Sequence, residues 1–83
     1  MIHYHIVIMK PARKFIERQI RPQQERLLRA IYSLPHVGDI KPLSGQENVY
    51  RLRVGNYRVI YSIHDDVLTV EVMAIGNRGD AYK

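Results

Sequence analysis

The chain has 83 residues, of which 46% are hydrophobic and 25% are charged, and it contains no cysteine. This composition is typical of one small packed domain, and it excludes a disulfide scaffold, a thiolate zinc site and a cysteine nucleophile. Thirteen Lys and Arg residues against eight Asp and Glu residues give a net charge of +5, which predicts attraction to a polyanion or to an acidic protein partner.

The N-terminal part predicts one strand and two helical segments. Residues 2–9 alternate between two faces, as a strand with one buried side requires. Pro11 suits the first turn of a helix that we expect to end near Ile20, because apolar residues then recur at helical spacing. Pro22 marks either a kink or the start of a second helix, whose apolar stripe stops at Pro35. We therefore expect a strand followed by an αα hairpin or a bent helix.

The next part predicts a loop and then a hairpin. Residues 35–48 are rich in Gly, Pro, Ser and Asn, and a loop of this length is unusual in so small a domain, which suggests a function. Residues 49–54 and 57–63 then alternate on either side of Gly55 and Asn56. This pair suits the tight turn of a two-residue β-hairpin.

A second turn at Asp65 and Asp66 leads into a last strand, Val67 to Ile75. The resulting β-α-α-β-β-β order predicts an α+β fold. We expect a mostly antiparallel four-stranded sheet with the two N-terminal helices packed on one face.

Several classes of protein do not fit this chain. The longest apolar runs, such as Ile6 to Met9, are far below the roughly 20 residues that span a bilayer, and the N-terminus lacks the apolar core of a secretory signal. We therefore expect a cytoplasmic protein with no membrane partner. A deep cofactor cavity is not expected, because so small a globule buries only about 60% of its unfolded surface.

The hairpin register predicts a cluster of arginines. With Gly55 and Asn56 as the loop residues, Arg53 lies opposite Arg58, and the period of two puts Arg51 on the same face. The other face is then the core, formed by Tyr50, Leu52, Val54, Tyr57, Val59 and Tyr61. Like charges opposite each other destabilise a sheet by a fraction of a kcal/mol. An anion, most simply phosphate, between the arginines would explain their arrangement.

A second interpretation of the same arginines stays open. They could form a solvated outer face, or they could be neutralised by Glu71 on the next strand. Three converging arginines favour the anion site. A register shifted by one residue would exchange the two faces and remove it.

Histidines and serines give weaker signals. His3 and His5 share a strand face, but two histidines without a third ligand do not predict a metal site. His36 and His64 could act as acid or base near neutral pH, although positions in turns explain them more simply. The serines lack a recognisable His and Asp context for nucleophilic catalysis: Ser33, Ser44 and Ser62.

The polar tail contains two residues suited to RNA. A base stacked on Tyr82 and a phosphate held by Arg78 would be one physically sensible use of this segment.

Three runs of residues resemble one family. The segments Lys41–Gly45 (KPLSG), Tyr50–Tyr61 (YRLRVGNYRVIY) and Ile75–Arg78 (IGNR), with Tyr82, resemble the RelE/ParE superfamily of toxins from type II toxin-antitoxin modules. The resemblance covers the whole chain in length and element order, and its most specific part is the second segment. It implies a single RelE-like toxin domain over residues 1–83.

The resemblance also implies an activity and partners. RelE-like toxins are ribosome-dependent endoribonucleases that cut mRNA in the ribosomal A site, need no metal or cofactor, and are held inactive in a hetero-oligomer with a cognate antitoxin. The 2′-hydroxyl of the RNA attacks its own neighbouring phosphate. The protein must therefore deprotonate that hydroxyl, stabilise the phosphoryl oxygens and protonate the leaving 5′-oxygen.

Carried over by motif, Arg51 and Arg53 match the basic pair on the first hairpin strand and Arg58 matches the phosphate-binding arginine on its partner. Arg78 matches the tail arginine and Tyr82 the terminal tyrosine. All five are candidate catalytic residues, and the four arginines are candidate contacts to the mRNA and ribosomal RNA.

The chain departs from the family pattern in two places. The best-known ribonuclease members have lysines where Arg51 and Arg53 stand, and an arginine effectively cannot lose a proton. Asn77 stands where many relatives have His or Lys. Tyr82 is then the best remaining general base. Two alternatives stay open, a ParE-like poison of DNA gyrase and a catalytically degenerate RNA-binding homologue.

The positive charge is concentrated in the N-terminal part. Residues 1–29 hold seven basic and two acidic residues (+5), residues 30–50 one and two (−1), and residues 51–83 five and four (+1). The excess therefore belongs to the predicted helices, where it would serve docking on ribosomal RNA or capture of an antitoxin.

Overall fold

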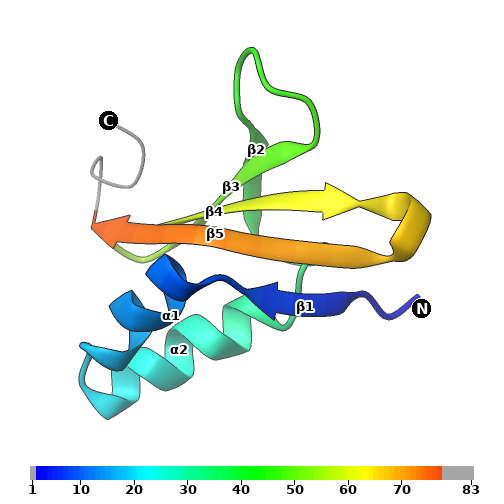
Figure 1. Ribbon diagram of the computed structural model, residues 1–83. Helices are drawn as coiled ribbons and strands as arrows, with labels where there is room; N and C mark the ends of the chain where they lie inside the picture. Colours follow the sequence, from blue (N-terminus) through cyan, green and yellow to red (C-terminus); the bar gives the residue numbers. More distant parts are fainter. Residues whose placement is uncertain (1, 78–83) are drawn as a thin grey trace.

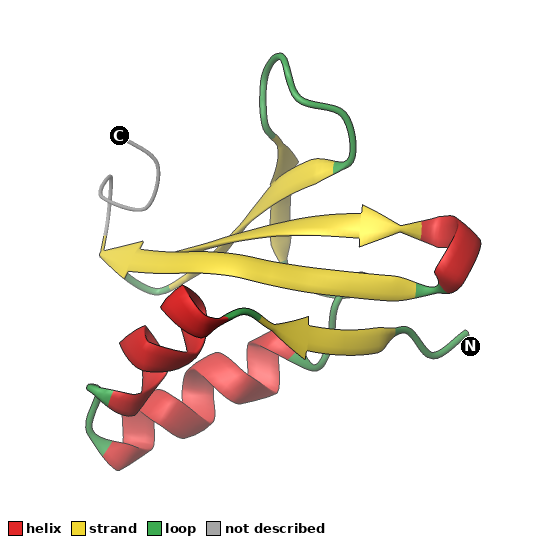
Figure 2. Cartoon of the chain, viewed as in Figure 1, coloured by secondary structure: helices red, strands yellow, loops and turns green. Residues whose placement is uncertain are grey.

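Two helices cover one face of a β-sheet in the computed structural model, which describes residues 2–77 (Figure 1). The elements follow in the order β1 (His5–Ile8), α1 (Lys10–Glu17), α2 (Arg21–Ile31), β2 (Asp39–Pro42), β3 (Val49–Val54), β4 (Tyr57–His64), a 3-10 turn (Asp65–Val67) and β5 (Thr69–Asn77). Figure 2 shows the helices together on one side of the strands. The predicted α+β class is confirmed.

Within residues 2–77 the sheet has five strands in the order β1-β5-β4-β3-β2. Its three pairings other than the parallel β1–β5 pair are antiparallel, as the prediction of a mostly antiparallel sheet requires. The predicted number of four strands is wrong, because Asp39–Pro42 lies along β3 as an edge strand instead of belonging to a loop. This strand ends in Pro42 and has a single apolar side chain, Ile40, so it shows no alternation.

Each helix begins with a proline in its first turn. Pro11 and Pro22 take positions where the missing N–H costs nothing, after an extended capping residue. The proline at position 22 therefore lies in the first turn of a second helix. Of the two predicted alternatives, the αα hairpin is confirmed and the single bent helix is wrong. The two helices end earlier than expected, at Glu17 and Ile31. No helix among residues 2–77 is long and apolar enough to cross a membrane.

Two strand boundaries also differ from the predictions. The strand β1 is shorter than residues 2–9, because its parallel partner β5 begins at Thr69, opposite His5. The β4–β5 connection is longer than the predicted two-residue turn. It contains the 3-10 turn and then Leu68 with φ +47°, so β5 starts two residues later than expected.

The hydrophobic core lies between the helices and the sheet. Its buried members are Ala12, Ile16, Leu27, Ile31, Leu34, Leu52, Val54, Val59, Tyr61, Val70, Val72 and Ile75. The predicted core face of the hairpin is confirmed, since four of its six residues are buried and Tyr50 and Tyr57 pack against the cluster. Burying each large apolar side chain contributes about 1.5–3 kcal/mol. Because this layer covers one face of β3 and β4, a substrate would have to bind on the other face.

Candidate functional site

The arginine face is built by the β3–β4 hairpin in the predicted register. Arg53 pairs with Arg58, and Arg51 pairs with Ile60. Gly55 opens the turn with φ +58°, a conformation that glycine adopts without steric cost. Because successive side chains alternate between faces, all three arginines lie on the face opposite the helices.

The three arginines differ in exposure. Arg53 is exposed, Arg58 is half-buried, and Arg51 is only 8% exposed. The Arg51 Nη2 atom lies 3.9 Å from Oδ1 of Asp39 on β2. Asp39 is therefore an acidic neighbour of Arg51, whereas Glu71 contacts Ser62 and His64. We call Arg53 and Arg58 the outward pair, and Arg51, two residues before Arg53 on β3, is the buried member of the cluster.

The other two candidate residues, Arg78 and Tyr82, lie outside the described residues. The end of β5 indicates where the tail begins. Gly76 pairs with Arg58, and Asn77 pairs with Tyr57. The last described residues of β5 therefore lie beside Arg58 on β4, whereas Arg53 lies one strand further away on β3.

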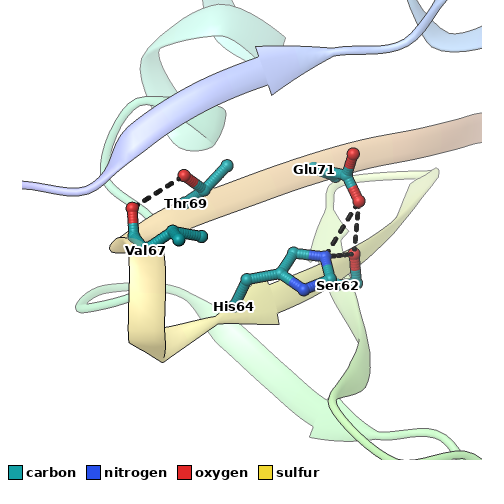
Figure 3. Close-up of polar contacts among 5 residues, drawn as sticks. All are labelled: Ser62, His64, Val67, Thr69 and Glu71. Carbon is teal, nitrogen blue, oxygen red and sulfur yellow. Dashed lines mark hydrogen bonds and ion pairs between the residues drawn. The ribbon is translucent and has the colours of Figure 1, made fainter.

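A polar cluster that sequence reasoning missed lies on the same sheet face (Figure 3). Nε2 of His64 lies 3.1 Å from the Ser62 hydroxyl oxygen and 2.9 Å from Oε1 of Glu71. The Ser62 hydroxyl also donates to Oε1 of Glu71, at 3.4 Å. We call these three residues the Ser62–His64–Glu71 cluster. Both imidazole contacts use one ring nitrogen, whereas the histidine of a nucleophilic triad uses both, so the cluster is not such a triad.

A sequence signal for this cluster exists. Ser62 and His64 are two apart on a strand and so share a face, and Glu71 pairs with Ser62 across β4 and β5. Ser62 thus has a histidine and a glutamate neighbour that the sequence analysis did not identify, although they do not form the His and Asp context of a nucleophile. The position of His64 next to the turn, as predicted, is compatible with this contact.

The contacts of His36 are structural and do not indicate a catalytic role. Nε2 of His36 lies 2.7 Å from the carbonyl oxygen of Ile2, and its ring packs edge-on against Tyr4. A pocket of about 220 Å³ lies there, and it is smaller than most ligand pockets. Its lining residues are Ile2, His3, Tyr4, Tyr32, Ser33, Leu34, His36 and Val37. Within residues 2–77, no group of three or more His, Cys, Asp or Glu side chains is placed to hold a metal ion.

Two described tyrosines are unsuited to proton abstraction. Burial, with a smaller contribution from Tyr50, raises the pKa of Tyr61 to about 12. The hydroxyl of Tyr4 donates to Asp65, and this hydrogen bond raises the pKa of Tyr4 above its ordinary value. A raised pKa keeps both phenols protonated at neutral pH.

Comparisons with known proteins agree on the fold. The archaeal RelE–RelB complex from Pyrococcus horikoshii is similar with a TM-score of 0.77 and 26% identity, over 96% of this chain and 100% of that one. The isolated E. coli RelE toxin is similar with a TM-score of 0.73 over 95% of this chain and 88% of that one, and at 20% identity this likeness concerns the fold alone. A Methanocaldococcus jannaschii protein, whose description as the toxin RelE1 is itself provisional, is 42% identical over 45 residues. That match spans 54% of this chain and only 50% of the relative.

A family match covers almost the whole sequence. The family described as "ParE toxin of type II toxin-antitoxin system, parDE" matches residues 6–82. This range includes the hairpin and the tail segment that carry the resemblance to the RelE/ParE superfamily, and it confirms that resemblance. On this match, the chain belongs to the ParE toxin family of type II toxin-antitoxin systems.

Proposed function

We propose that this protein is a RelE-like toxin that cleaves mRNA on the ribosome without a metal ion. The observation that carries the proposal is the direct cross-strand pairing of Arg53 with Arg58 on the face that the helices leave free. Two cations at this spacing oppose folding slightly, and a phosphate group between them would convert that repulsion into two charge-assisted contacts.

The proposed reaction needs three kinds of group. The RNA 2′-oxygen bonds to the phosphorus, the bond to the 5′-oxygen breaks, and a 2′,3′-cyclic phosphate and a free 5′-hydroxyl result. Arg53 and Arg58 would hold the non-bridging oxygens, where charge develops in the transition state. Tyr82 would accept the proton of the 2′-hydroxyl, Arg78 would add a phosphate contact, and water would protonate the 5′-oxygen.

Arg51 would have a different role from the outward pair. Its burial and its contact with Asp39 make it a poor direct ligand for an incoming phosphate. It would instead add positive potential from its place two residues before Arg53 on β3, where its low exposure reduces screening by water. This role would not need an exposed side chain.

We also propose an antitoxin partner in a hetero-oligomer. The P. horikoshii relative is a complex of RelE with RelB, and residues 1–29 of this chain carry the positive excess. An antitoxin segment with acidic and apolar side chains would suit that surface and would obstruct the arginine face. A toxin-antitoxin complex in which the arginine face stays open and unaltered would contradict this arrangement.

The proposal is tested by Tyr82→Phe, with Tyr32→Phe as the matched control because Tyr32 is 62% exposed on the far side of the fold. Ribosome-bound mRNA is incubated with each purified protein, and the new RNA ends are mapped. We expect Tyr82→Phe to lower cleavage by about 10²- to 10⁴-fold, as loss of a general base does, and the control to cleave normally. A fully active Tyr82→Phe protein would exclude Tyr82 as the base, and an inactive parent would exclude the ribonuclease.

Poisoning of DNA gyrase is the second candidate, favoured by the description of the matching family as ParE toxins. Induced expression followed by an assay of the SOS response and of gyrase-linked DNA breaks separates the two functions. The ribonuclease proposal expects mRNA cleavage without DNA breaks. Growth arrest that a co-expressed antitoxin relieves would count against a degenerate homologue.

A further inference from the structure

The Ser62–His64–Glu71 cluster lies on the proposed RNA-binding face. Ser62 and His64 follow Arg58 on the same side of β4, because residues two apart on a strand share a face. Ser62 lies four positions after Arg58, which corresponds to about 13 Å along a strand. The cluster is therefore too far away to contact a phosphate held by Arg53 and Arg58, but a neighbouring nucleotide of the same RNA strand would reach it.

The hydrogen bonds of the cluster join three atoms and leave two other polar atoms open. All three contacts use Nε2 of His64, the Ser62 hydroxyl or Oε1 of Glu71. In a neutral imidazole, Nε2 carries the proton because it faces a carboxylate, so Nδ1 is an acceptor. Among the described residues, Nδ1 of His64 and Oε2 of Glu71 have no hydrogen-bond partner, and Figure 3 shows Oε2 pointing away from the other two residues.

The open acceptors are held in place and remain accessible to a ligand. The side chains of His64 and Glu71 are 42% and 38% exposed, whereas Ser62, which contacts both, is only 7% exposed. A side chain with two fixed contacts loses less conformational freedom on binding than a free surface side chain does. The cluster therefore presents acceptors in a defined orientation.

We propose that Glu71 and His64, positioned by Ser62, form a nucleobase subsite that accepts a hydrogen bond from an exocyclic amino group. This inference rests on the proposed function. A carboxylate repels the phosphates of an RNA strand, so its place on this face suits a base edge and not the backbone. Carboxylates accept hydrogen bonds from base amino groups, and single-stranded RNA is read on exposed base edges. Adenine, cytosine and guanine carry such a group, whereas uracil has none, and its N3–H donor stands between two carbonyl oxygens that Glu71 would repel.

The test is Glu71→Gln, with Glu25→Gln as the control. Both replace a carboxylate with an amide, but Glu25 is exposed on α2, on the covered side of the sheet. Ribosomes carry an mRNA library randomised around the A site, and cleavage is counted for each base at each position. We expect the parent and Glu25→Gln to select against uracil at one position near the cut. In Glu71→Gln that selection should weaken about tenfold, because an amide can also donate to a carbonyl.

A second variant and a binding measurement keep the inference testable if the first arm fails. His64→Asn should weaken the same selection at the same position. Binding of 2′-O-methyl RNA hexamers, which lack the attacking hydroxyl, is compared between adenine-rich and uracil-rich sequences by fluorescence anisotropy. We expect the parent to bind the adenine-rich hexamer more tightly and Glu71→Gln to lose this preference.

The outcomes separate the subsite from the proposed function. If the parent cleaves and neither variant changes the base preference, the ribonuclease stands and the subsite is overturned. If the parent does not cleave, the ribonuclease proposal is refuted. The subsite is then tested by hexamer binding alone: a preference for the adenine-rich hexamer that Glu71→Gln removes supports it, and equal binding of both hexamers overturns it. If Glu71→Gln changes only the affinity for an antitoxin, the cluster belongs to a protein interface and the proposal is overturned.

Discussion

Arg53 and Arg58 lie directly opposite each other on β3 and β4, while Asp39 faces Arg53 from the other side, on β2. Arg53 thus stands between a cation and an anion on adjacent strands. Its repulsion from Arg58 is offset in part by its attraction to Asp39, each amounting to a fraction of a kcal/mol at an exposed site. The fold can therefore hold two arginines side by side at little cost in stability.

We expect Arg53→Gln to separate function from stability. The variant loses one repulsive and one attractive neighbour, so its free energy of unfolding should stay within about 0.5 kcal/mol of the parent. Cleavage of ribosome-bound mRNA should fall by about 10²-fold or more, because a preorganised contact to the phosphoryl oxygens is lost. Urea unfolding and mapping of RNA ends measure the two quantities. Cleavage by Arg53→Gln equal to that of the parent would refute a role for Arg53.

The pair formed by Arg51 and Asp39 should respond asymmetrically to mutation. Removing Arg51 as Arg51→Met leaves Asp39, whose side chain is 58% exposed and returns to water, and it removes the like charge opposite Lys41. We expect a change within about 0.5 kcal/mol. Asp39→Asn leaves a cation that is 8% exposed without its carboxylate, which should cost about 1 kcal/mol, less than for a fully buried pair.

Urea unfolding of the two single variants and of the double variant measures this asymmetry. The double variant should recover most of the stability that Asp39→Asn loses, because it no longer buries an unpaired charge. A larger loss of stability for Arg51→Met than for Asp39→Asn would contradict this account. It would show that the packing of the Arg51 side chain stabilises the sheet more than its pairing with Asp39 does.

The hairpin could be predicted to the residue because its register depends on a local signal. Gly55 and Asn56 fix which residues face each other, and alternation then assigns every side chain of β3 and β4 to a face. The core face and the position of the arginines both follow. The exposure of each arginine does not follow, because Arg51 owes its burial and its carboxylate neighbour to β2, an edge strand without an alternating pattern.

The pairing of β5 with β4 could not be predicted from the sequence. A register shift between Ile60 and Tyr61 leaves Met73 without a partner on β4. Without this bulge, Ile75 and not Gly76 would pair with Arg58, so the bulge returns Ile75 to the core. No residue pattern in the last strand marks it. The Ser62–His64–Glu71 cluster was missed for a different reason, because the predicted two-residue turn at Asp65 and Asp66 would place Thr69, and not Glu71, opposite Ser62.

Alkaline pH should destabilise the protein through Tyr61. Its folded-state pKa of about 12 exceeds the ordinary value of 10.0, so the unfolded chain loses the proton first. The stabilisation is complete below pH 10 and is lost as the pH rises toward 12. We expect Tyr61→Phe to reduce this loss by about 1 kcal/mol at pH 11.

At neutral pH the same variant should be as stable as the parent or more stable by up to about 1 kcal/mol. The buried Tyr61 hydroxyl has no hydrogen-bond partner among the described residues, so phenylalanine removes an unsatisfied group. Thermal or urea unfolding at pH 7, 9 and 11 measures both effects, with Tyr32→Phe as the exposed control. Identical pH profiles for the parent and Tyr61→Phe would contradict this account.

Gly38, which directly precedes β2, should be harder to replace than Gly45, which follows β2. Its φ is +136°, and a Cβ atom there would approach Cδ1 of Leu52, a fully buried core residue, to 2.5 Å. Gly45 also has a positive φ, +76°, but a Cβ atom there meets nothing within 4 Å. Gly45→Ala should therefore cost only the backbone term, about 1–2 kcal/mol, whereas Gly38→Ala should cost about 1–3 kcal/mol more through overpacking. Urea unfolding of the two variants isolates the packing term.

Gly38→Ala should also lower RNA cleavage, because Gly38 directly precedes Asp39 and a shift of β2 would move the carboxylate from Arg51. Equal stabilities of the two alanine variants would show that Leu52 adjusts without cost.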